Sequence, residues 1–102
     1  MNIRFERSGG FTAIPMHLVV DTSRLDPAAG QALVKLVEQS QFYSLQDKIQ
    51  SPSGAADQYD YRLTIEDGGR SHTVETGDVG APATLQALLQ QLTLMARLSR
   101  SG

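Results

Sequence analysis

The stretch "YDYRLTIEDGGRSHTVETG", residues 59–77, decides the fold. Its tyrosine and aliphatic residues alternate with polar residues as far as Ile65, which is the period of a strand that is buried on one face. Asp67-Gly68-Gly69 follows, and glycine is typical of a tight hairpin turn because it adopts positive φ without steric cost. A turn over the two glycines places Ile65 opposite His72 and Leu63 opposite Val74, whereas a turn over Asp67 and Gly68 shifts the partners but preserves the faces. The stretch therefore predicts an antiparallel hairpin.

Two further strands are predicted nearer the start of the chain. Residues 2–7, "NIRFER", and residues 16–21, "MHLVVD", both alternate apolar with polar side chains. Ser8-Gly9-Gly10 supplies a turn between them. Because Pro15 lacks an amide donor, it belongs at a strand start or at the edge of the sheet.

The segment "LDPAAGQALVKLVEQ", residues 25–39, predicts the first helix. Asp26 stands where a side chain can cap free amides, and Pro27 suits the first helical position. One apolar stripe recurs at helical spacing: its residues are Ala29, Leu33, Leu36 and Val37.

A second helix is predicted over residues 83–98. Its apolar stripe is long: Leu85, Leu88, Leu89, Leu92, Met95 and Ala96. Leu94 and Leu98 fall outside this stripe, so the apolar arc is wider than one packing face requires. The wide arc indicates either a deeply embedded helix or a contact between two copies.

Residues 46–58 show neither period and are predicted to form a loop, longer than the ~4–6 residues usual between elements. The order strand, strand, helix, strand, strand, helix predicts an α+β fold. In it a four-stranded, mainly antiparallel sheet carries two helices on one face. We expect a single domain over residues 1–102.

Composition excludes several classes of protein. The chain has 102 residues, a net charge of −2 and no cysteine, so a disulfide framework, a cysteine zinc site and a thiol nucleophile are all excluded. The basic residues are scattered, which argues against a nucleic-acid partner. No run approaches the ~20 apolar residues of a membrane span, and no secretory signal opens the sequence. We therefore expect a cytoplasmic protein without a membrane partner.

The sequence offers little for catalysis. The only imidazoles are those of His17 and His72. Ser71 precedes His72, but neighbours on a strand point to opposite faces. No phosphate-binding glycine motif occurs, and no set of ligands at matching spacing indicates a metal site of its own. We expect a binding domain without a cofactor rather than an enzyme.

The order of motifs along the chain resembles the emfourin family. The resemblance is carried by "RFERSGGFTAIP", "VDTSRLD", "LVKLVEQSQFYSL", "AADQYDYRLTIEDGGRSHTVETGD" and "LQALLQQL". It spans nearly the whole chain. Members often have a proline just after the "F-x-x-L" segment, where this chain has Gln46, and that departure bears on the shape of the following loop.

This resemblance implies an inhibitor of bacterial thermolysin-like and protealysin-like zinc metalloproteases. The family is thought to use two loops: one presents an aspartate to the zinc of the protease, and the other presents apolar groups to its substrate pockets. The best match for the aspartate is Asp57, with Asp60 as the next candidate. Phe11 and Ile14 match the apolar groups, beside Gly9 and Gly10.

Other interpretations remain beside this one. Asp57 could cap a turn or strand, and Phe11 and Ile14 could fold back onto the core or continue the strand. The alternative function is a non-enzymatic interaction module or a homodimer that uses Leu94 and Leu98, whereas the inhibitor is expected to be a monomer. The zinc role further requires the 8–15 turn and the 46–58 loop to lie at the same end of the sheet.

Overall fold

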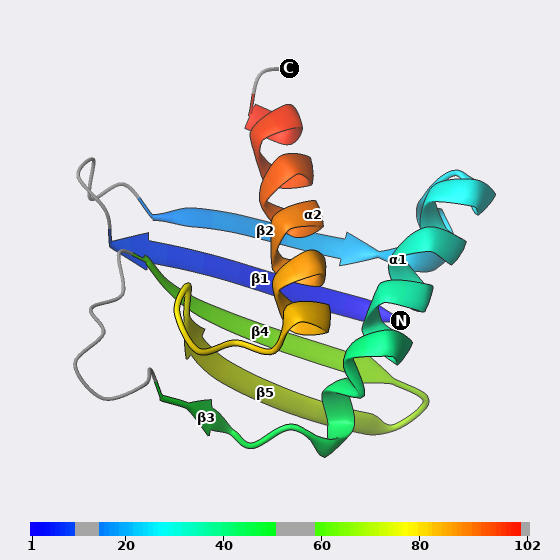
Figure 1. Cartoon of the computed structure of the whole chain (residues 1–102). Helices are drawn as coiled ribbons and strands as arrows, with labels where there is room; N and C mark the ends of the chain where they lie inside the picture. Colours follow the sequence, from blue (N-terminus) through cyan, green and yellow to red (C-terminus); the bar gives the residue numbers. More distant parts are fainter. Residues whose placement is uncertain (10–14, 51–58, 101–102) are drawn as a thin grey trace.

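Five strands form one sheet within residues 1–9, 15–50 and 59–100, the parts of the chain that the computed structural model describes. The strands are β1 (Asn2–Gly9), β2 (Met16–Asp21), β3 (Lys48–Ile49), β4 (Tyr59–Asp67) and β5 (Arg70–Gly77). The helices are α1 (Pro27–Ser40) and α2 (Ala83–Arg100), and two 3-10 turns are η1 (Thr22–Arg24) and η2 (Phe42–Ser44). Both α-helices lie on one face of the sheet (Figure 1).

The predicted hairpin is confirmed by the pairing of β4 with β5. Ile65 lies opposite His72 and Leu63 opposite Val74. Gly68 and Gly69 have φ values of 57° and 85°, and two successive positive φ angles are what a type I′ hairpin turn requires. Because the register follows from this turn, the apolar side of both strands faces the helices.

The sheet differs from the prediction in strand number and in direction. The strand order is β2-β1-β4-β5-β3, and β3 pairs parallel to β5, so the sheet is five-stranded and mixed. Its pairing begins where the Glu75 amide donates to the Asp47 carbonyl at 2.8 Å. The prediction of an unbroken loop over residues 46–58 was wrong at Lys48 and Ile49, because two residues are too short to show an alternating pattern.

The first predicted turn also begins later than expected. Ser8 and Gly9 belong to β1, where they lie opposite Asp60 and Tyr59. Gly9 has a φ of 90° at the end of the strand. The pairing with β4, which the sequence of β1 alone does not reveal, extends β1 by two residues beyond its alternating part.

The core lies between the sheet and the two helices. The apolar stripe of α2 is confirmed, since its leucines and Ala96 are buried and Met95 is half-buried, whereas Leu94 and Leu98 are exposed. Phe42 and the apolar residues of β1, β4 and β5 complete this cluster. In the described part of the chain, no helix is long and apolar enough to cross a membrane.

The predicted stripe of α1 is confirmed at Leu33 and Val37, which are buried, and at Leu36, which is half-buried, but it was wrong at Ala29, which is exposed. Gly30 and Ser40 complete the buried face. At Gly30 the reason is the close approach of η1: a Cβ atom on Gly30 would lie 2.6 Å from the Thr22 carbonyl oxygen. Asp26 does occupy the N-cap position, but its side chain makes no capping hydrogen bond.

Candidate functional site

One end of the sheet gathers the residues that border both predicted loops. β1 ends at Gly9, which lies opposite Tyr59 at the start of β4. Met16, at the start of β2, lies opposite Arg7 of the same β1 strand. β3 runs parallel to β5 toward this end as well, so Gln50 follows there. We call Gly9, Pro15, Gln50, Tyr59 and Gly77 the rim, and Figure 1 shows these strand ends at the side of the molecule away from α1.

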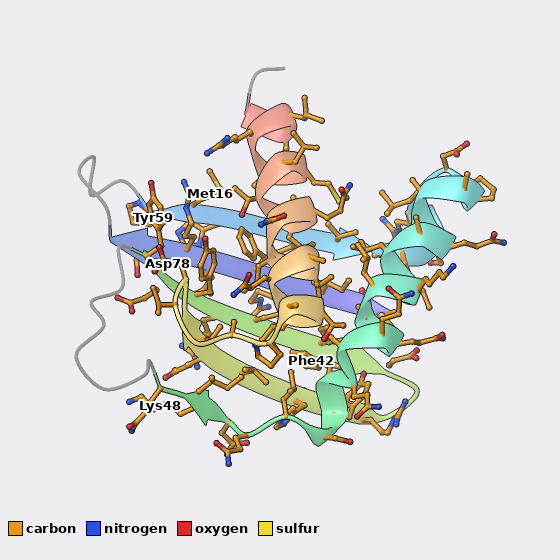
Figure 2. The ribbon with its side chains drawn as sticks, viewed as in Figure 1. Met16, Phe42, Lys48, Tyr59 and Asp78 are labelled. Atoms are coloured by element: carbon orange, nitrogen blue, oxygen red, sulfur yellow. The ribbon has the colours of Figure 1, made fainter. Side chains whose placement is uncertain are left out.

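Tyr59 is the best-supported residue of the rim. The guanidinium carbon of Arg7 lies 4.2 Å from the centre of its ring, a cation–π contact typically worth about 0.5–1 kcal/mol at an exposed site. The Tyr59 carbonyl accepts a hydrogen bond from the Asp78 amide at 3.3 Å. Figure 2 shows Tyr59, Asp78 and Met16 together at this end of the sheet. The start of β4 is therefore held from two sides.

Tyr61 connects the rim to the core. Its ring lies 6.0 Å from that of Phe5 and 6.4 Å from that of Tyr59. Burial raises the pKa of Tyr61 above its usual value near 10, and the charge and hydrogen bond of Arg7 partly offset this rise. The phenol is consequently neutral at physiological pH. The Arg7, Tyr59 and Tyr61 side chains thus form a continuous stack behind the rim.

A hollow of about 580 Å³ lies beside the rim, mainly on the face of the sheet away from the helices. Charges of alternating sign cross it in register from strand to strand, with His17 opposite the first of them: Glu6, Arg62, Glu75 and Lys48. The Arg62 Nε and Glu75 Oε1 atoms are 3.8 Å apart and both side chains are exposed, so this ion pair contributes little stability. The row gives this face a polar, charge-balanced surface.

The structure describes two of the predicted protease-binding residues. Gly9 closes β1 in the rim. Asp60 lies one residue inside β4, is exposed, and lines the hollow. The other predicted residues, Gly10, Phe11, Ile14 and Asp57, lie outside the described residues.

Sequence reasoning missed the support of the rim. Arg7, Tyr59 and Asp78 were not predicted as site residues, although all three adjoin the strand ends that border the two segments. Their association depends on the pairing of β1 with β4, whose partners are far apart in the sequence. The available signal was the position of Tyr59 at the first residue of the clearest strand.

The two histidines have structural environments. The His72 Nε2 atom donates to the Leu45 carbonyl at 2.8 Å, and its ring meets that of Phe42 edge-on at 5.4 Å. His17 is exposed on the face away from the helices. Among the residues that the structure describes, no group of three or more His, Cys, Asp or Glu side chains could hold a metal ion.

Comparison with known proteins identifies the family. The family model described as Emfourin matches residues 5–93, which include β2 to β5, most of β1 and most of α2. The chain belongs to the emfourin family. Membership of the emfourin family supports a role as a metalloprotease inhibitor at the level of the family, and is consistent with a protein that is not an enzyme. No curated protein and no solved structure matches the chain significantly.

Proposed function

We propose that this chain inhibits thermolysin-like and protealysin-like zinc metalloproteases by stoichiometric blockade of the active site. The segment after β1 and the segment before β4 insert together. Asp57 presents its carboxylate to the catalytic zinc, while Phe11 and Ile14 enter apolar substrate pockets. Membership of the emfourin family supports the inhibitory class. The rim supports the use of two segments together, because both start from it.

The observation that carries the proposal is the pairing of Gly9 with Tyr59. Residues opposite each other in an antiparallel pair have Cα atoms about 4.5–5.5 Å apart. The chain therefore leaves β1 and enters β4 at neighbouring points at one end of the described sheet. A common end is the condition that a two-segment blockade requires.

Covalent geometry limits how far the two proposed contact residues can lie from the rim. Asp57 precedes Tyr59 by two residues and Phe11 follows Gly9 by two residues. Two residues of chain span at most about 7 Å. The chain length therefore allows both proposed contact residues to reach a single protease active site.

The proposed chemistry of Asp57 is ligand exchange at the zinc of the target. A catalytic zinc retains an open position for water, and a carboxylate oxygen at about 2.0–2.2 Å can fill it. Occupation by Asp57 displaces the water that would attack the peptide bond. No step consumes the inhibitor, so the blockade is stoichiometric.

One carboxylate does not supply tight binding by itself, because association costs at least several kcal/mol. Each apolar side chain that is fully buried in a pocket contributes about 1.5–3 kcal/mol. Phe11 and Ile14 provide two such anchors. The stack of Arg7 on Tyr59 provides a rigid base for one segment, which lowers the entropy cost of docking.

The test is titration of the chain into a thermolysin-like peptidase from the same organism while peptide cleavage is followed. We expect activity to fall to zero near one equivalent. Asp57→Asn should raise the inhibition constant roughly 30-fold. This corresponds to a loss of about 2 kcal/mol or more of binding free energy. Asp26→Asn is the matched control, because Asp26 is exposed at the N-cap position of α1, away from the rim.

A cobalt-substituted peptidase separates the zinc role from mere contact. Binding of the wild-type chain should shift the visible absorption bands of the metal, since a carboxylate replaces water. Binding of Asp57→Asn should leave those bands unshifted. Full activity at excess inhibitor would contradict the proposed function, and unchanged inhibition by Asp57→Asn would contradict the choice of residue.

A further inference from the structure

The outer edge of β2 is a long free edge of the sheet. β2 lies at one end of the strand order, and no other strand in the described part of the chain pairs with its outer side. Proteins usually blunt such an edge by shortness, lysine, proline or a bulge. The opposite edge strand, β3, has only two residues. β2 has six, its register with β1 is continuous, and its sequence "MHLVVD" holds neither lysine nor proline.

Exposed apolar side chains flank this free edge. Val19 is 70% exposed and Leu98 is 64% exposed, which is unusual for large apolar residues. Both line a second hollow, of about 570 Å³, between β2 and the C-terminal part of α2. Leu18, Leu25 and Met95 add further apolar surface to it. The unpaired backbone and the apolar patch therefore coincide.

We infer that β2 pairs antiparallel with β2 of a second copy of this chain, so that two sheets join into one. This interaction is independent of the proposed inhibitory function and uses a different part of the molecule. A symmetric antiparallel pair of edge strands has its two-fold axis perpendicular to the sheet. Paired residues then share a face, so one residue of each strand lies opposite its own copy across the axis. The axis is named below by that residue.

The register is set by a hydrogen bond and by apolar contact. With the axis at Val19, Val19 meets its own copy, and His17 lies opposite Asp21 of the second copy, twice by symmetry. An axis at Leu18 would instead place His17 opposite Val19, and an axis at Val20 would place Val19 opposite Asp21. Hydrogen-bonded pairs and β-branched pairs across strands stabilise a sheet. Only the Val19 axis provides both.

Asp21 has acceptor capacity left for this contact. Its Oδ1 atom accepts from the Ser23 amide at 3.0 Å and from the Ser23 hydroxyl at 2.7 Å. These two hydrogen bonds lower the pKa of the Asp21 carboxyl, so it is ionised at neutral pH. Arg24 Nε lies 3.8 Å from the other oxygen, Oδ2. Each carboxylate oxygen accepts two hydrogen bonds, so Oδ2 can receive one from a His17 imidazole.

Helix α2 extends the contact on the other face. Its C-terminal half lies over β2, as Figure 1 shows and as the shared hollow requires. The two-fold axis at Val19 brings the same half of the second α2 alongside. Leu94 and Leu98, four residues apart and exposed on one side of the helix, would then be covered.

The test measures self-association by sedimentation from micromolar to millimolar concentration. We expect the mass of the wild-type chain to rise from 11.1 kDa toward twice that value. Val19→Glu and Val19→Lys each place like charges on the axis, and each should weaken association at least about tenfold. An equimolar mixture of the two variants should associate again, because glutamate then faces lysine. Val19→Thr is the control for folding, because it keeps the β-branched shape and places no charge on the axis.

Each outcome decides the inference. A wild-type chain that stays monomeric at millimolar concentration overturns it, and so does a dimer that both charged variants leave intact. Failure of the mixture to associate overturns the register. Inhibition by the monomeric Val19→Glu variant should be unchanged, so failure of the dimer and failure of the inhibitory role are distinguishable.

Discussion

Gly30 shows how one residue can be chosen for contact rather than for helix formation. In an exposed helix, alanine is about 1 kcal/mol better than glycine. Here a Cβ atom would lie 2.6 Å from the Thr22 carbonyl oxygen, which is backbone and cannot rotate away. Steric overlap of this kind in a packed site costs about 1–3 kcal/mol, so contact outweighs propensity.

We therefore expect Gly30→Ala to lower the free energy of unfolding by up to about 2 kcal/mol, the overlap minus the gain in propensity. Denaturant unfolding measures this change. Gln31→Ala, an exposed position one residue on, is the control and should be neutral or slightly stabilising. Higher stability of Gly30→Ala would mean that α1 and η1 separate without cost.

At the scale of the element, the start of β4 links fold to function. Arg7 packs on the Tyr59 ring, and the Tyr59 carbonyl accepts from the Asp78 amide. Only the first of these contacts uses the side chain. A substitution that removes the ring should consequently loosen the segment before β4 without unpairing the strand.

We expect Tyr59→Ala to weaken inhibition of the target peptidase about tenfold, close to 1.4 kcal/mol, and Arg7→Ala to weaken it by a similar factor. Tyr59→Phe should inhibit like the wild type, because the ring remains. Inhibition constants measure these effects. Arg24→Ala removes an equally charged but remote side chain that is 88% exposed; an equal loss with that variant would refute the supporting role of Arg7.

Sequence could predict the elements that are long enough to repeat their pattern of apolar residues. The hairpin, its buried face and the stripe of α2 follow from repeated alternation or helical spacing. β3 and the 3-10 turns are no longer than one repeat and leave no pattern. The stripe of α1 was wrong at Ala29, which is apolar but exposed, whereas Gly30 is buried by contact with Thr22.

Prediction of the site had a different limit. Asp57, Phe11 and Ile14 came from the resemblance to emfourin and not from any local pattern. That the described ends of their segments adjoin could not be read from the sequence, because it depends on β1 lying between β2 and β4. Strand order reflects long-range packing. The composition of a loop does not indicate which end of the sheet the loop adjoins.

At the scale of the whole molecule, the two ends of the sheet differ in the segments that they carry. The rim gathers the borders of both segments, whereas the opposite end carries the hairpin turn over Gly68 and Gly69. A Cβ atom at either glycine would meet nothing within 4 Å. Residues can therefore be inserted into the hairpin turn without contacting the rim.

Inserting Gly-Ser between Gly68 and Gly69 should lower stability by about 1 kcal/mol, since it replaces a preferred two-residue turn, and should leave the inhibition constant unchanged. The same dipeptide inserted between Gln58 and Tyr59 should abolish tight inhibition, because it lengthens the chain between Asp57 and the start of β4. Thermal unfolding and enzyme titration test both. Equal effects of the two insertions on inhibition would show that function is not confined to one end.

The position of β1 between β2 and β4 has a consequence for how the sheet is made. β1 is synthesised before its partner β4, which is complete only at Asp67. Until then Ile3 and Phe5, which are fully buried in the folded state, have only β2 available for pairing. A nascent chain arrested before β4 emerges should thus be protease-sensitive, and folding of the sheet must wait until β4 has been made.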